Sequence, residues 1–277
     1  MRKPLRYGLP MNWSVRVTLI FIALLAFPFR SPAPLIFVPG EGWTYETPGE
    51  KGNWKRESMR EQIKVAEEAL AAKDYGTSLK AARRVVNYRK GLSDYAPRAQ
   101  YIIGRSHEAR HKDEKAFNAY QQVVEKYPKI ANYQEILHRQ FDIATRFLGG
   151  QRFRLWGVIP FFPSMEKTAD MYTKVIKNGP YSGIAPQAQM NIGAAREKQS
   201  AYPLAIKAYE RAADRYHDQP KVASEALYKA ALAYNKEAKT AEYDQSVAGQ
   251  AIATFTDFMT LYPEDPRQTQ AKKIIGS

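Results

Sequence analysis

The sequence predicts an all-α solenoid of about five stacked helical hairpins. In residues 96–128, apolar or small side chains recur three and four positions apart on both sides of a polar break at 112–115. The same spacing of small and aromatic residues returns in 186–217: Gly104, Ala116 and Tyr120 in the first segment, Gly193, Ala205 and Tyr209 in the second. Small residues at fixed helical offsets allow close helix packing, so this recurrence indicates repeated hairpins.

The hairpins are expected between residues 57 and 266. The first pairs residues 57–72 with a helix that starts near Asp74, and apolar periodicity traces a further helix over 133–148. A proline that stops a helix follows an aromatic residue at the same eight-residue step in three places. These steps run from Tyr120 to Pro128, from Tyr172 to Pro180 and from Phe255 to Pro263. A fifth hairpin is therefore expected to end near residue 263.

The pattern resembles the tetratricopeptide repeat, a unit of about 34 residues with small residues at the helix contacts. The resemblance implies that the first helices of the hairpins line a groove suited to a peptide. By register, the expected partner-binding groove residues are Arg98, Tyr101, Arg105 and Glu108 in the second hairpin, and Gln187, Met190, Ala194 and Glu197 in the fourth. Arginine beside aromatic or thioether groups can hold a carboxylate next to an apolar side chain.

Composition narrows the possible functions. Cysteine is absent from the 277 residues, which excludes disulfides, thiolate metal sites and a lipid anchor on an N-terminal cysteine. The formal net charge of +14 favours an acidic partner, although the basic side chains of the N-terminal half are most simply a solvated face. They are not interleaved with aromatics as in a stacking platform, so no nucleic acid is expected as a partner.

Both ends of the chain are expected to lie outside the solenoid. Residues 1–33 are a predicted signal peptide or N-terminal anchor, because basic residues precede the short apolar run VTLIFIALLAF. A buried helix of a cytosolic protein is the alternative. Residues 34–56, rich in proline and glycine, are expected to be a linker without regular structure. Residues 267–277 are expected to form a C-terminal tail with a short helix over 271–275.

The segment 149–163, GGQRFRLWGVIPFFP, interrupts the repeats and contains too much glycine and proline for a simple helix. Its large apolar side chains form a candidate partner-binding or membrane-surface loop: Phe153, Leu155, Trp156, Phe161 and Phe162. Exposed apolar groups in such number mark a docking site. The alternative, a loop folded back on its own solenoid, is equally compatible with the sequence.

One motif suggests metal chemistry. The sequence His107-Glu108-Ala109-Arg110-His111 matches H-E-x-x-H, in which two histidines one helical turn apart bind zinc and the glutamate activates water. No third histidine follows at the metzincin spacing. In register with the repeat, His107 occupies a packing position, so a structural histidine is favoured over a zinc peptidase. No other catalytic motif is present, and the sequence predicts neither an enzyme nor a bound cofactor or metal.

Repeats, predicted export and the C-terminal segment with Ala251, Phe255, Phe258 and Pro263 resemble the BamD-type outer-membrane assembly proteins. The resemblance implies a periplasmic scaffold at the outer membrane that binds the barrel insertase and unfolded outer-membrane proteins. The chain departs from that family in lacking the lipidated cysteine. A periplasmic coordinator of cell division or envelope transport, built from the same repeats, is the alternative.

Overall fold

The computed structural model describes residues 35–38, 42–45, 54–56, 58–88, 93–155, 159–160, 164–240 and 245–276. The chain divides into two compact units, Met1–Asn53 and Trp54–Ser277. The expected signal peptide or anchor, residues 1–33, lies outside the described residues.

The first unit contains an antiparallel pair of strands, β1 (Leu35–Val38) and β2 (Gly42–Tyr45). The expectation that residues 34–56 lack regular structure is therefore wrong for these eight residues. The strand sequences LIFV and GWTY are rich in β-branched and aromatic residues, which favour extended backbone. The proline and glycine between them suit a turn as well as they suit a linker.

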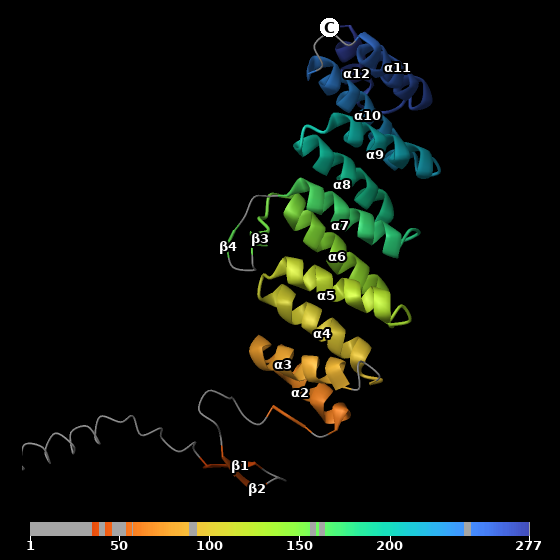
Figure 1. The fold of residues 1–277 in the computed structure, drawn as a ribbon. Coiled ribbons are helices and arrows are strands. Elements are labelled where there is room, and N and C mark those ends of the chain that lie inside the picture. Colours follow the sequence, from red (N-terminus) through yellow and green to blue (C-terminus); the bar gives the residue numbers. More distant parts are fainter. Residues whose placement is uncertain are drawn as a thin grey trace, which may run out of the picture. The chain divides into compact units, whose positions relative to one another are not determined.

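In the second unit, the described helices form five hairpins and a closing helix, and each packs against the next in chain order (Figure 1). The hairpins are α2 (Met59–Ala71) with α3 (Tyr75–Asn87), α4 (Ala96–Ala109) with α5 (Asp113–Lys126), α6 (Tyr133–Leu148) with α7 (Met165–Asn178), α8 (Ala185–Lys198) with α9 (Tyr202–Arg215), and α10 (Pro220–Thr240) with α11 (Gln245–Leu261). The closing helix is α12 (Gln268–Ile275). The predicted all-α solenoid of about five hairpins is confirmed.

Local signals fix several helix ends. Ser58, Asp74 and Ser164 cap α2, α3 and α7 by accepting a hydrogen bond from a backbone N–H in the first turn. Three hairpin turns contain a residue with left-handed backbone: Lys73 (φ 61°), His111 (φ 53°) and Ser200 (φ 57°). Each follows the first helix of its hairpin, so the three turns reverse the chain in the same way.

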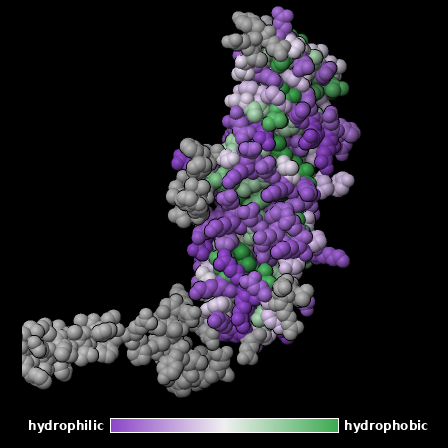
Figure 2. Space-filling view, viewed as in Figure 1, coloured by the Kyte–Doolittle hydropathy of each residue, from purple (hydrophilic) through white to green (hydrophobic). Residues whose placement is uncertain are grey.

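Aromatic side chains and alanines fill the space between the hairpins. Tyr120, Tyr172 and Phe255, which mark the eight-residue steps in the sequence, are all buried. Ala271 of α12 packs in the cluster that contains Phe255 and Phe258, so part of the expected tail belongs to the core. Polar residues dominate the outside, and Figure 2 shows hydrophobic residues on one face mainly as narrow areas among hydrophilic ones.

The insertion between α6 and α7 contains a second short antiparallel pair, β3 (Arg154–Leu155) and β4 (Ile159–Pro160). Figure 1 shows these two strands beside the α6–α7 hairpin. Among the described residues, no helix combines the length and the apolar character needed to cross a membrane.

Candidate partner-binding surface

In two of the hairpins, the same kind of glycine–tyrosine contact holds the first helix against the second. A methyl group at Gly104 of α4 would collide with the ring of Tyr120 on α5, and one at Gly193 of α8 would collide in the same way with Tyr209 on α9. Both tyrosines are fully buried. The close helix approach predicted from the spacing is confirmed, because only a residue without a Cβ leaves room for each ring.

Each of these tyrosines also fixes a glutamate on the first helix of its hairpin. Tyr120 Oη donates to Glu108 Oε2 over 2.7 Å, and Tyr209 Oη donates to Glu197 Oε2 over 2.5 Å. Burial, and then the hydrogen bond to the glutamate, raises the pKa of both tyrosines far above its usual value, so they remain protonated donors. Two of the expected groove residues are therefore anchored by the hairpin core.

In the second hairpin, Glu108 also binds two arginines of α6. Arg139 Nη1 donates to Glu108 Oε2 over 3.2 Å, and Arg146 Nη2 donates to Glu108 Oε1 over 3.4 Å. Arg146 continues to the buried carboxylate of Asp113 at the start of α5, with bonds of 2.9 and 3.1 Å from Nη2 and Nε. The carboxylates of α4 and α5 are thus joined to the next hairpin by charge-assisted hydrogen bonds.

The network extends along α4 through Glu135 of α6. Tyr101 Oη donates to Glu135 Oε1 over 2.6 Å and accepts from Arg105 Nη1 over 3.0 Å, while Arg139 Nε donates to Glu135 over 2.9 Å. Burial alone would raise the pKa of Glu135, but these hydrogen bonds lower it overall. We call this set the α4–α6 network: Tyr101, Arg105, Glu108, Asp113, Glu135, Arg139 and Arg146. Its three arginines balance three carboxylates.

The fourth hairpin has a simpler arrangement. Lys236 Nζ of α10 donates to Glu197 Oε1 over 2.8 Å. Gln187 is exposed and donates to Asn191 Oδ1 over 3.0 Å, and Ala194 is half-buried. The first helices of the two hairpins therefore present different polar surfaces on the same internal framework.

Two other expected groove residues differ in their exposure to solvent. The Arg98 side chain is 68% exposed and forms an ion pair with Glu67 of α2. Met190 is only 4% exposed and packs in the core with Ile206 and Tyr209, so its assignment to the groove is wrong. In the structure, Met190 directly follows the buried Gln189 and lies on the side of α8 that faces α9. An error of one residue on a helix turns a side chain by about 100°.

The first residues of the insertion fold back onto α6. Phe153 is 4% exposed and stacks on Phe147 with ring centroids 4.0 Å apart, and Lys167 Nζ lies 5.1 Å from the Phe153 ring centroid. For Phe153 the exposed docking role is therefore wrong. The side chains of the other four residues of the expected docking loop lie outside the described residues: Leu155, Trp156, Phe161 and Phe162.

The HEARH segment does not keep its two histidines on one helical face. Helix α4 ends at Ala109, and His111 has left-handed backbone, so the one-turn spacing needed by a zinc pair is lost. His107 is 8% exposed, and its Nδ1 has no hydrogen-bond partner. Burial, and then the charges of Arg83, Lys115, Lys112 and Arg110, lowers the pKa of His107 to about 4. No group of three metal-ligating side chains occurs in the described part of the chain.

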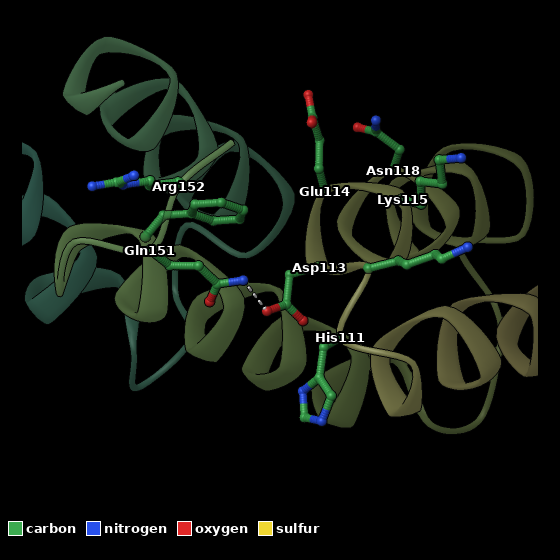
Figure 3. A pocket seen from close by; sticks show the side chains of 9 residues that line it. His111, Asp113, Glu114, Lys115, Asn118, Gln151 and Arg152 are labelled. Carbon is green, nitrogen blue, oxygen red and sulfur yellow. Dashed lines mark hydrogen bonds between the residues drawn. The ribbon is translucent and has the colours of Figure 1, made fainter. Parts of the chain in front are cut away.

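A pocket of about 210 Å³ lies at the tip of the second hairpin. We call it the hairpin-tip pocket. Figure 3 shows Glu114, Lys115 and Asn118 of α5 on one side, Gln151 and Arg152 on the other, and His111 at one end. Gln151 Nε2 donates to Asp113 Oδ2 over 2.6 Å, and Phe147 contributes the apolar part of the lining.

The sequence did not indicate Glu135, Arg139 or Arg146 as members of the surface. One signal was available: Arg139 and Arg146 are seven residues apart, which places them on one face of α6 two turns apart. Their carboxylate partners on α4 and α5 are 31 to 38 positions distant in the chain, so only the packing of the third hairpin on the second identifies them.

The helices and their stacking define a tetratricopeptide-like α-solenoid. Residues 98–129, most of the second hairpin, match the family model of the tetratricopeptide repeat. No curated protein matches the sequence.

Similar solved structures include tetratricopeptide-like repeats of a putative kinesin light chain from Podosopora anserina, at 13% identity and a TM-score of 0.34 over 72% of this chain and 97% of that one. MamA from Desulfovibrio magneticus has 11% identity and a TM-score of 0.36 over 76% and 98%. The complex of the TPR2AB domain of yeast Sti1 with an HSP90 peptide has 15% identity and a TM-score of 0.32 over 79% and 83%. Similarities this weak carry no information on what the chain binds.

Proposed function

We propose that this protein is a non-catalytic scaffold that binds another polypeptide along the first helices of its hairpins. The α4–α6 network supports the proposal most strongly. Apart from the buried Asp113, its arginines and carboxylates are partly exposed, yet the buried Tyr120 and mutual hydrogen bonds hold them in one arrangement. Side chains ordered before binding lose less conformational entropy when a partner arrives.

The exposed members of this surface suit a polypeptide ligand. Arg98 and Gln187 project from α4 and α8, and the Arg105 side chain is also partly exposed. Guanidinium and amide groups can bind backbone carbonyls and acidic side chains without chemical change to the ligand. This surface therefore favours binding over catalysis.

The proposed setting is the periplasm, with a role in outer-membrane β-barrel assembly. The barrel insertase and unfolded outer-membrane proteins are the proposed partners, and the surface of the outer membrane is the proposed place of action. This part of the proposal rests on the N-terminal sequence and on the resemblance to BamD-type proteins.

Affinity purification of the tagged full chain from detergent-solubilised envelopes tests both the scaffold function and the role in β-barrel assembly. We expect the barrel insertase to co-purify, and we expect the double variant Arg98→Glu/Gln187→Glu to reduce its recovery several-fold. The matched control is Gln122→Glu/Lys207→Glu, which makes the same change of charge at exposed positions on the second helices α5 and α9.

Recovery of only cell-division or transport proteins would replace the assembly role by the coordinator role. Equal recovery with both double variants would count against the first-helix surface as the binding site. A measurable hydrolytic activity of the purified chain that His107→Ala abolishes would overturn the non-catalytic assignment.

A further inference from the structure

The hairpin-tip pocket carries an excess of unpaired positive charge. Its two acidic side chains already have basic partners from other elements, since Asp113 binds Arg146 and Glu114 lies 3.7 Å from Lys167. By contrast, Lys115 and Arg152 form no ion pair within the described residues. The electrostatic potential at the mouth of the pocket is therefore positive, because these two side chains face solvent.

The positive surface continues past the pocket toward α3. Burial is the main reason why the pKa of His107 is lowered, and Arg83 of α3, Lys115 and Arg110 of the α4–α5 turn are near enough to His107 to lower it further. Arg83 and Arg110 also form no ion pair within the described chain. The tip of the second hairpin thus differs from the α4–α6 network, in which arginines and carboxylates are balanced.

The size of the pocket limits what can enter it. A volume of about 210 Å³ is below the roughly 300–1,000 Å³ of pockets that enclose small-molecule ligands. The buried ring of Phe147 gives it an apolar lining. It therefore suits one apolar side chain, with cations around the opening for neighbouring anionic groups.

We propose that the hairpin-tip pocket is a docking site for an acidic polypeptide segment that inserts one apolar or aromatic side chain. The side chain contacts Phe147, and flanking carboxylates contact Lys115, Arg152 and Arg110. This inference rests on the proposed scaffold function and adds a second binding site with a stated partner chemistry. An anionic membrane is less suitable, because a recessed pocket for a single side chain offers little to a flat array of headgroups.

Fluorescence polarisation with the full chain and a labelled peptide, DEDEFDEDE, tests the proposal. We expect saturable binding, weakened at least about tenfold by Lys115→Glu/Arg152→Glu, because two attractive charge contacts become repulsive. The control Lys207→Glu/Arg211→Glu makes the same change of charge on exposed residues of α9 and should bind like the wild type. A peptide with serine in place of phenylalanine should bind several-fold more weakly.

The variant Asn118→Trp blocks the pocket from an exposed position without changing charge, and it should also weaken binding several-fold. Circular dichroism of each variant would test whether it is folded. Equal affinity for wild type and Lys115→Glu/Arg152→Glu, or binding only to vesicles containing phosphatidylserine, would overturn the proposal. If the peptide fails to bind while the first-helix surface still captures its partner, the pocket assignment fails and the scaffold function stands.

Discussion

The second and fourth hairpins share a framework and differ in what surrounds it. In each, a glycine, a glutamate four residues later and a tyrosine of the second helix make the same contacts. Glu108 is then bound by two arginines of the next hairpin, whereas Glu197 is bound by one lysine. The repeated contacts stabilise each hairpin, and the side chains contributed by the following helix determine which charged groups surround the glutamate.

The glycine–tyrosine contact should show the largest effect in both hairpins. Gly104→Ala or Gly193→Ala places a methyl group against a fully buried ring, and overpacking of this kind costs about 1–3 kcal/mol. We expect values near 3 kcal/mol, because several ring atoms lie within the collision distance. Thermal and urea unfolding of the two variants would measure the loss of stability.

Gly249 in α11 provides the matched control, because a Cβ at this position meets open space. Gly249→Ala should raise stability by up to about 1 kcal/mol, since alanine loses less backbone entropy in a helix. Equal effects at all three glycines would show that the collision is relieved by movement of the hairpins.

The tyrosine hydroxyls should distinguish the two hairpins. Tyr209→Phe leaves Glu197 with Lys236 as its remaining charged partner and should cost about 2 kcal/mol, the usual loss for a hydrogen bond to a charged group. Tyr120→Phe should cost about 1 kcal/mol, because Arg139 and Arg146 still bind Glu108. Chemical unfolding gives both values, and the reverse order would mean that the arginines contribute little.

A difference in pH response should also separate the hairpins, because His107 corresponds in position to Arg196 of the fourth. Burial lowers the pKa of folded His107 to about 4 from an ordinary 6.5. Below pH 6.5 the unfolded chain therefore binds a proton that the folded chain does not, and stability should fall as the pH drops from 6.5 to about 4.

The charges of Arg83, Lys115, Lys112 and Arg110 also lower the pKa of His107. His107→Gln should reduce the slope of melting temperature against pH in this window. His217 in the turn after α9 is exposed, so His217→Gln should leave the slope unchanged. An unaltered slope in His107→Gln would assign the acid sensitivity to other groups.

The sequence predicted the hairpins more completely than the surfaces. Gly104, Tyr120 and their counterparts in the fourth hairpin lie within 16 residues of each other, so one periodic pattern contains the whole contact. Glu108 and Arg146 are 38 residues apart and meet only because the third hairpin packs on the second. Met190 shows a different limit, since the repeat register locates a helix face only to within one residue, and that difference decides between core and groove.

The smallest expected effect concerns the hairpin turns, where His111 and Ser200 occupy equivalent left-handed positions. Glycine adopts this backbone without the steric cost of a Cβ, so His111→Gly and Ser200→Gly should each raise stability by about 0.5–1 kcal/mol. If His111 instead bound zinc, only its replacement would remove a metal-dependent rise in melting temperature. Melting curves with EDTA and with added zinc therefore separate the two roles, and we expect both glycine variants to melt higher than the wild type regardless of metal.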